Sequence, residues 1–312
     1  MTLPRKIPVA VHGQLDPDGI VESLATFGVV LIDRAGFGQS ELDRLRALAR
    51  TYFEQPDQVK RSDAMSNHGA AWRGWFGVGD ELTSGQPDAK EGFYFGTDLP
   101  VHDPRVVGRR PMHGPNPEPT GVPELRAAVE DWMSLATSIG MDVLSAVAMG
   151  LGLPGHWFAS NWCRDPTVLF RIFRYPAAGE SAEVSRGVGP HTDYGLLTVL
   201  AHDGVPGLEI EIDGGWVAMP SDPQLLIVNT GDMLERATAG RLRSTVHRVV
   251  SPDRHRYSFP LFLDPAWDAV VRPLPGFDIE PLAHPGAYGD YLLDRVSKVF
   301  PELFRDQFGT GR

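Results

Sequence analysis

Residues 189–200 read GPHTDYGLLTVL, and residues 240–250 read GRLRSTVHRVV. The first stretch contains His191 and Asp193, and the second contains His247, 54 positions after Asp193. Residues i and i+2 of a strand point to the same face, so His191 and Asp193 can approach one ion from a strand end. Two histidines and one carboxylate form the facial triad, which binds non-haem Fe(II) and leaves coordination positions open. The sequence therefore predicts an iron site at these three residues.

A candidate acid-binding pair follows the second histidine. Residues 256–265 read RYSFPLFLDP, in which Arg256 and Ser258 share one face of an otherwise apolar strand. A guanidinium binds a carboxylate through two parallel hydrogen bonds, and a neighbouring hydroxyl adds another. An unpaired buried charge is costly, so we expect Arg256 and Ser258 to bind the carboxylate of an acid near the metal.

The pattern around these motifs predicts the fold. Residues 167–265 are short apolar runs, often β-branched, separated by Gly, Pro and Asp, which is typical of a jelly roll. We therefore predict a mainly β protein with α: a double-stranded β-helix (jelly-roll) core with an N-terminal helical lobe and a C-terminal helix. The expected segments are a mixed helical lobe at 1–160, the core at 161–270 and a helical extension packing on the core at 271–312.

Periodicity outside the core predicts further elements. Residues 63–122 are rich in Gly, Pro and Asp and are expected to form loops over the core. The expected strands are 7–11 and 29–33, and the expected helices are 16–28, 38–56, 122–152 and 285–300.

Composition restricts the partners. The chain has 312 residues and a net charge of −11, which disfavours nucleic acid and anionic membranes. Its single cysteine, Cys163, excludes an internal disulfide and a cysteine-based metal site. We see no signal peptide and no run of about 20 uninterrupted apolar residues. We therefore expect a cytoplasmic protein, a monomer or weak homodimer, that acts on a small molecule rather than on nucleic acid or a membrane.

Several segments together resemble one family. They are VLFRIFRYP (168–176), GPHTDYGLLTVL, GLEI (207–210), GWVAMP (215–220), NTGDMLERATAGRLRSTVHRVV (229–250), RYSFPLFLDP, and, nearer the ends, WRGWFGVGDE (72–81), DAKEGFYFG (88–96) and YGDYLLDRVSKVFP (288–301). The chain resembles the isopenicillin-N-synthase-like branch of the Fe(II)/2-oxoglutarate-dependent dioxygenases. That branch includes plant flavonoid oxygenases and aminocyclopropanecarboxylate oxidase. The resemblance runs along nearly the whole chain in the family order.

The resemblance implies a role for each motif. His191, Asp193 and His247 would bind Fe(II), whose open positions take 2-oxoglutarate and O₂. Arg256 with Ser258 would hold the distal carboxylate of 2-oxoglutarate. Tyr175 matches a family tyrosine that contacts co-substrate or substrate. Oxidative decarboxylation of 2-oxoglutarate would then give succinate and CO₂.

Three functions remain open on the sequence. The first is a 2-oxoglutarate-dependent oxygenase of secondary metabolism that hydroxylates, desaturates or cyclises a small metabolite. The second is a 2-oxoglutarate-independent iron oxidase or cyclase in which the substrate ligates iron; Phe173 favours it, because some 2-oxoglutarate users have Asn at that position. The third is a non-enzymatic jelly-roll binding module. The complete triad argues against this last reading, since a pure binder has no need of three convergent ligands.

The substrate pocket is predicted from aromatic residues. The candidates are Trp72, Trp75, Phe76, Phe93 and Phe95. We expect the barrel mouth to be closed by residues 72–80 and 93–95 and by the C-terminal helix at 288–293. Arg73 is expected to pair with Glu81 or Asp80. Asn229 and Asp232 are expected to support the metal strand, and His113, His202 and His255 are not expected to be ligands.

Overall fold

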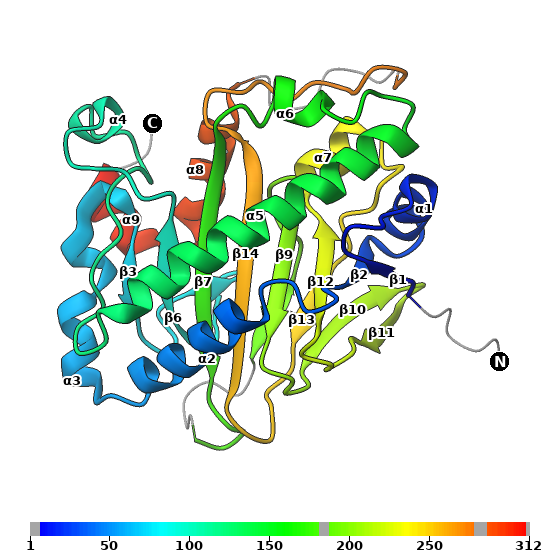
Figure 1. The fold of residues 1–312 in the computed structure, drawn as a ribbon. Helices are drawn as coiled ribbons and strands as arrows, with labels where there is room; N and C mark the ends of the chain where they lie inside the picture. Colours follow the sequence, from blue (N-terminus) through cyan, green and yellow to red (C-terminus); the bar gives the residue numbers. More distant parts are fainter. Residues whose placement is uncertain (1–6, 181–186, 278–285, 310–312) are drawn as a thin grey trace.

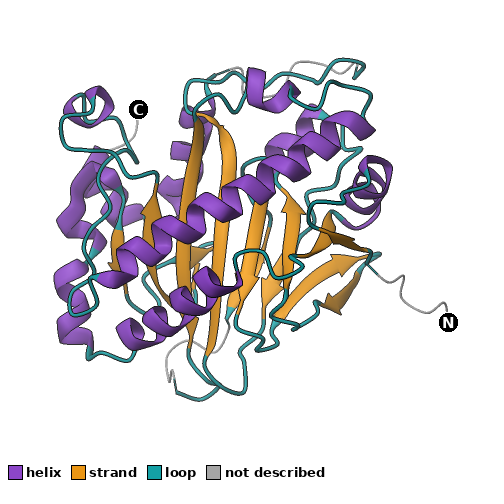
Figure 2. Ribbon diagram, in the orientation of Figure 1, coloured by secondary structure: helices purple, strands orange, loops and turns teal. Residues whose placement is uncertain are grey.

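The computed structural model describes residues 7–180, 187–277 and 286–309. Its core is a pair of sheets partly covered by helices (Figure 2). The large sheet has the strand order β1-β2-β12-β9-β14-β7-β6-β3, and the small sheet has the order β11-β10-β13-β8. Apart from the parallel pair β1 and β2, the paired strands are antiparallel. The predicted jelly-roll core is confirmed.

The strands have the following bounds. The large sheet contains β1 (Val9–Val11), β2 (Val29–Asp33), β3 (Gly74–Phe76), β6 (Glu91–Gly96), β7 (Pro166–Tyr175), β9 (Leu197–His202), β12 (Leu225–Thr230) and β14 (Arg256–Ala266). The small sheet contains β8 (Val188–His191), β10 (Leu208–Ile212), β11 (Gly215–Ala218) and β13 (His247–Val249). A separate hairpin consists of β4 (Leu82–Thr83) and β5 (Gln86–Pro87).

The helices lie outside the strands of the core. The α-helices are α1 (Pro17–Phe27), α2 (Gln39–Phe53), α3 (Asp57–Lys60), α4 (Pro104–Val107), α5 (Glu124–Gly150), α6 (Trp157–Asn161), α7 (Asp232–Ala237), α8 (Tyr288–Val299) and α9 (Pro301–Phe308). Two 3-10 helices are η1 (Arg61–Asp63) and η2 (Met65–Ala71). Helix α5 crosses the face of the large sheet, where it contacts β9 and β14, and α2 runs beside it (Figure 1).

The ends of α1 follow from two residues. Asp16 caps its N-terminus by accepting a hydrogen bond from the Gly19 amide at 3.1 Å. Gly28 ends it in the left-handed conformation, with φ of 67°. A Cβ at Gly28 would also lie 2.4 Å from the Arg243 carbonyl oxygen, so only glycine fits where this turn meets the chain before β13.

Helix α5 is the central helix of the covering layer. Gly140 allows it to approach the sheet, because a Cβ there would lie 2.9 Å from the Leu263 side chain. By length and composition α5 could cross a membrane, with a mean hydropathy of 1.3 over its most apolar window. Half of that window is buried inside the protein, which is typical of a core helix. The expectation that no membrane is involved stays a prediction.

The predicted loop region at 63–122 is wrong in part. Strands β3 and β6 extend the edge of the large sheet beside β7. Both strands are buried on both faces, so their sequences lack the polar alternation that marks a strand. With β1 and β2, they also carry the large sheet beyond the predicted core at 161–270. Residue 285, where the C-terminal helix was predicted to start, lies outside the described residues; α8 begins at Tyr288.

Candidate active site

Alternate residues of the strands line one cavity of about 880 Å³. On β7, β9, β10, β12, β13 and β14 the residues that line the cavity are two apart, which is the period of a strand, whereas on β8 they are three apart. The large sheet contributes Tyr94 from β6, Leu169, Arg171, Phe173 and Tyr175 from β7, Thr198 and Leu200 from β9, Ile227 and Asn229 from β12, and Arg256, Ser258, Pro260, Phe262 and Asp264 from β14. The small sheet contributes Val188, His191, Leu208, Ile210, His247 and Val249. The cavity therefore lies between the two sheets.

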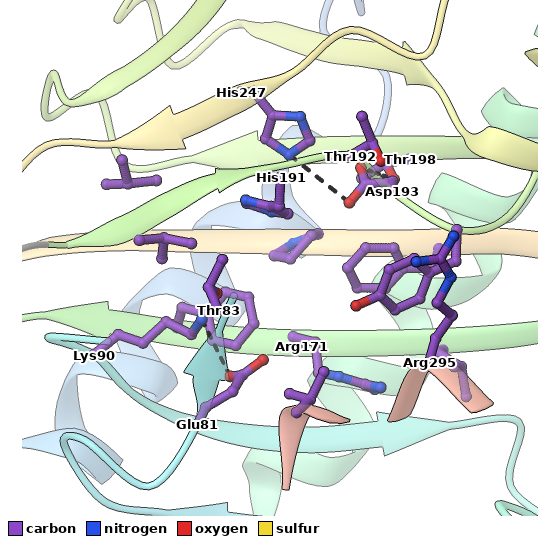
Figure 3. Close-up of a pocket in the computed structure, with 18 of the residues that line it drawn as sticks. Glu81, Thr83, Lys90, Arg171, His191, Thr192, Asp193, Thr198, His247 and Arg295 are labelled. Atoms are coloured by element: carbon purple, nitrogen blue, oxygen red, sulfur yellow. Dashed lines mark hydrogen bonds and ion pairs between the residues drawn. The ribbon is translucent and has the colours of Figure 1, made fainter. Parts of the chain in front are cut away.

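His191, Asp193 and His247 converge in this cavity (Figure 3). One potential ligand atom from each lies within 4.8 Å of the other two. His191 and His247 are direct partners in the antiparallel pair β8–β13, and Asp193 lies two residues beyond the end of β8. The sequence prediction that these three side chains meet is confirmed by the structure.

Both imidazoles are oriented by backbone carbonyls. His191 Nδ1 lies 2.8 Å from the Gly189 oxygen, and His247 Nδ1 lies 3.1 Å from the Thr245 oxygen. Because a carbonyl only accepts, each Nδ1 carries the proton and each Nε2 keeps its lone pair. This arrangement fixes the ring of a metal-binding histidine. His247 Nε2 lies 3.8 Å from Asp193 Oδ1, which leaves room between them for a cation.

The Asp193 carboxylate is held by one oxygen. Its Oδ2 accepts hydrogen bonds from Thr198 Oγ1 at 2.5 Å and from Asn229 Nδ2 at 2.7 Å. Thr198 and Asn229 are cross-strand partners on β9 and β12. The Asp232 amide donates to the Asp193 backbone oxygen at 2.8 Å, so the predicted support by Asn229 and Asp232 is confirmed. Oδ1, on the His247 side, is left for a metal.

The electrostatic environment suits a divalent cation. Burial, followed by the neighbouring His247, lowers the pKa of His191 to about 4. Burial alone would raise the pKa of Asp193, but the two histidines and the Thr198 and Asn229 donors outweigh it and lower that pKa. Neutral imidazoles and an ionised carboxylate are the protonation states that bind metal. Two nitrogen donors and one oxygen donor fit Fe(II).

Arg256 lines the same cavity as the triad. Its side chain is buried, yet its Nε and Nη1 have no hydrogen-bond partner among the described residues. Its guanidinium carbon lies 4.9 Å from the centre of the Tyr175 ring, its partner across β14 and β7. Ser258, two residues along β14, lines the same cavity. A bound carboxylate would satisfy these donors, so Arg256, Ser258 and Tyr175 fit one end of 2-oxoglutarate.

The predicted aromatic pocket needs correction. Trp72 lines the cavity, whereas the other four aromatics do not: Trp75, Phe76, Phe93 and Phe95. On β6 the alternation turns Tyr94 toward the cavity and its two neighbours away, where their rings stack at 4.5 Å. Trp75 instead donates from Nε1 to Glu91 at 2.9 Å. The register of the edge strands, which the sequence does not specify, decides which aromatics face inward.

The segments predicted to close the cavity also differ from those that line it. Residues 81–85 around the β4–β5 hairpin line the cavity, as do residues 295–301 at the end of α8 and the start of α9. Of the predicted closing residues, Trp72, Tyr94 and Leu292 line the cavity. The C-terminal helix therefore covers the site one turn later than predicted.

Charged residues of the cavity wall were missed by the sequence analysis. Glu81, Lys90, Arg171 and Arg295 line it (Figure 3). Arg171 lies in the apolar run VLFRIFRYP, so the argument that singled out Arg256 applied to it as well. The expected pairing of Arg73 is wrong: Arg73 donates to the Met112 carbonyl oxygen at 3.1 Å, and Glu81 pairs with Lys90 at 3.2 Å.

The remaining histidines stay apart from the triad. Within residues 7–180, 187–277 and 286–309, His191, Asp193 and His247 are the one group of His, Cys, Asp or Glu close enough to share an ion. His202 is the last residue of β9, and its Nδ1 accepts a hydrogen bond from the Gly204 amide. His113 packs against Trp267, and His255 lies 3.0 Å from an Arg174 nitrogen. None of them was expected to be a ligand.

Comparison with known proteins agrees with the geometry. The model of the 2OG-Fe(II) oxygenase superfamily matches residues 166–265. A second model, the N-terminal region of non-haem dioxygenases in morphine synthesis, matches residues 18–121. The first match includes all three residues of the triad together with Arg256 and Ser258.

Whole-chain relatives extend this match. A probable iron/ascorbate oxidoreductase of Dictyostelium discoideum is 36% identical, covering 91% of this chain and 88% of that protein. A 2-oxoglutarate-dependent ethylene/succinate-forming enzyme of Ralstonia nicotianae is 28% identical over 96% of this chain and 91% of its own. The crystal structure of a 2OG-Fe(II) oxygenase family protein from Caulobacter crescentus superimposes with a TM-score of 0.78 at 27% identity, covering 94% of this chain and 98% of that one. The chain belongs to the 2OG-Fe(II) oxygenase superfamily and is an oxidoreductase that uses Fe(II), 2-oxoglutarate and O₂.

Proposed function

We propose that this protein oxidises a small metabolite by hydroxylation, desaturation or cyclisation, with release of succinate and CO₂. The observation that carries the proposal is the buried Arg256 guanidinium, whose Nε and Nη1 lack partners in the described part of the chain, in the same cavity as the triad. The Ralstonia relative, named for 2-oxoglutarate dependence and succinate formation, supports the same co-substrate.

Each group of residues has a distinct part in this proposal. Iron with 2-oxoglutarate and O₂ supplies the oxidising chemistry. His191, Asp193 and His247 would hold the metal on the small sheet, and Thr198 with Asn229 would keep Asp193 turned toward it. Arg256 and Ser258 would bind the distal carboxylate of 2-oxoglutarate from β14. The cavity walls would exclude water from the reacting atoms and position the substrate.

The size of the cavity supports a small substrate. Its volume of about 880 Å³ lies within the range of about 300–1,000 Å³ that is usual for small-molecule sites. It has to hold both 2-oxoglutarate and the substrate. The acidic chain, with a net charge of −11, supports action on a free metabolite rather than on nucleic acid. We also propose that the protein is cytoplasmic and is a monomer or weak homodimer.

The test is the dependence of turnover on 2-oxoglutarate. Metal-free protein is loaded with Fe(II) under nitrogen, mixed with 2-oxoglutarate and exposed to O₂, and succinate is measured. We expect succinate in proportion to the 2-oxoglutarate consumed, at a basal rate without substrate and a higher rate with it. Substrate oxidation without 2-oxoglutarate and without succinate would instead assign the protein to the 2-oxoglutarate-independent oxidases.

A further inference from the structure

The cavity has positive charge on the side away from the triad. Arg171 from β7 and Arg295 from α8 both line it, and Figure 3 shows them across the cavity from His191 and His247. The two histidines belong to the small sheet, whereas Arg171 belongs to the large one. A molecule bound between these walls would have one end at the arginines and its body toward the metal.

Arg171 is a buried cation without an ionised partner. Its Nη1 donates to the Phe95 and Phe170 backbone oxygens at 3.2 and 3.0 Å. Its guanidinium carbon lies 3.4 Å from the centre of the Tyr94 ring. No carboxylate lies within 4.0 Å of it in the described part of the chain, although only 5% of the residue is exposed. Buried charges are usually paired, and Arg171 lines the cavity, so an anion bound there would pair with it.

The neighbouring charges are already paired. Lys90 lies 2.8 Å from Asp88 and 3.2 Å from Glu81, and the second oxygen of Glu81 accepts from Tyr94 at 2.9 Å. Burial lowers the pKa of Arg171, and the charges of Glu81 and Asp264, which line the same cavity, act against that lowering without either carboxylate lying within 4.0 Å of it. Arg295 lies 3.5 Å from Asp232, and its side chain is 32% exposed, so it can still turn toward a ligand in the cavity.

Arg171 is too far from Arg256 for both to bind the same carboxylate. Tyr175 pairs with Arg256 across β7 and β14, and Arg171 lies four residues earlier on β7. At about 3.3 Å per residue this is roughly 13 Å along the strand. A second anionic group, separate from the distal carboxylate of 2-oxoglutarate, is needed to fill both sites. The rings of Tyr94 and Phe262 lie beside the Arg171 guanidinium, and the cavity is also lined by Leu82, Phe173, Tyr194 and Phe300.

We propose that the substrate is a small carboxylic acid with an apolar body, whose carboxylate is bound by Arg171 while Arg295 covers it from α8. This inference rests on the proposed function, since it places the substrate in the same cavity as iron and 2-oxoglutarate. The apolar body would lie along the aromatic wall, between the carboxylate and the metal.

Binding to a protein that cannot turn over tests the inference. Metal-free protein is loaded with Ni(II) and saturating 2-oxoglutarate, then titrated calorimetrically with 4-phenylbutyrate, indole-3-propionate and octanoate and with the three matching amides. The amides keep the shape and lose the charge. We expect at least one acid to bind about 30-fold more tightly than its amide, the equivalent of about 2 kcal/mol for a charge-assisted hydrogen-bonded pair. Arg171→Gln should remove this preference, and Arg171→Lys should keep part of it.

Matched variants separate the outcomes. Arg295→Gln should weaken binding of the acid by only about three- to tenfold, because exposed charges are screened by water. Arg241→Gln, which removes an exposed arginine, should leave that binding unchanged. If none of the acids binds, or if acid and amide bind alike, the inference is overturned. It is also overturned if Arg171→Gln binds the acid as the wild type does. Should that variant fail to fold, Arg171→Lys and Arg295→Gln decide in the same titration. Intact 2-oxoglutarate binding by the Ni(II) protein, and succinate formation by the same variants loaded with Fe(II), would show that the proposed function survives such a failure.

Discussion

Thr198→Val tests how the protein orients its metal-binding carboxylate. The hydroxyl of Thr198 donates to Asp193 Oδ2 at 2.5 Å, and Asn229 donates to the same oxygen. Valine has nearly the same shape and removes this one hydrogen bond. Asp193 then keeps a single donor and is freer to rotate its Oδ1 away from His247.

The expected size of the effect follows from the contacts. A hydrogen bond to a charged group contributes about 1.5–3 kcal/mol, and loss of a partner of a metal ligand typically weakens metal binding about 10- to 100-fold. Because Asn229 remains at 2.7 Å, we expect the lower end, a roughly tenfold rise in the Kd for Fe(II). In the double variant Thr198→Val with Asn229→Ala, the Kd for Fe(II) should rise roughly 100-fold.

The assay is anaerobic calorimetric titration of metal-free protein with Fe(II). Thr230→Val is the matched control, because Thr230 is equally buried on β12 and its hydroxyl has no partner in the regions the structure describes. Thr230→Val should bind Fe(II) as the wild type does. If Thr198→Val and Thr230→Val have the same Kd within about twofold, the reasoning about Asp193 is refuted.

Three further changes follow from the same structure. His247→Ala should abolish Fe(II) binding and succinate formation while the far-ultraviolet circular dichroism stays that of the wild type; retained turnover would contradict its role as a ligand. Arg256→Lys keeps the charge but loses the planar guanidinium that can form two parallel hydrogen bonds with a carboxylate. The 2-oxoglutarate concentration at half-maximal rate should therefore rise about tenfold or more, and an unchanged value would argue against binding of 2-oxoglutarate by Arg256. Burial raises the pKa of Asp264 to about 7 from 3.8, so its ionisation destabilises the folded state increasingly as pH rises from about 4 to 7. Metal-free Asp264→Asn should therefore be more stable than the wild type at pH 8, by at most roughly 4 kcal/mol, with the difference shrinking toward pH 4; chemical denaturation at both pH values checks this, and a difference independent of pH would contradict it.

The His191–Asp193 part of the metal triad could be predicted because its signal is local, whereas His247 meets these residues only through the pairing of β13 with β8. His191 and Asp193 are two residues apart at a strand end, and the spacing alone places them on one side. Arg256 and Ser258 follow the same rule on β14. The orientation of Asp193, by contrast, depends on Thr198 and Asn229, which meet only because β9 and β12 pair in one register. Pairing of this kind cannot be read from spacing along the chain.

The aromatic residues that face the cavity could not be predicted either, because strand register decides which of them point inward. Phe93 and Phe95 looked like pocket residues by type, but the register of β6 against β7 turns Tyr94 inward instead. Strands β3 and β6 were missed because burial on both faces removes the alternation that would reveal them. Arg171 carried a readable signal, a charge within an apolar strand, and the structure places it in the cavity wall.

The central claim is that one cavity holds iron on His191, Asp193 and His247 and 2-oxoglutarate on Arg256. An anaerobic crystal structure with Fe(II) and 2-oxoglutarate tests it most directly, using anomalous scattering at the iron edge. We predict one iron peak within roughly 2.0–2.2 Å of a nitrogen of each histidine and an oxygen of Asp193, as for comparable donors. One carboxylate of 2-oxoglutarate should be within hydrogen-bonding distance of Arg256. Iron bound elsewhere, or 2-oxoglutarate absent from Arg256 at saturating concentration, would contradict the account.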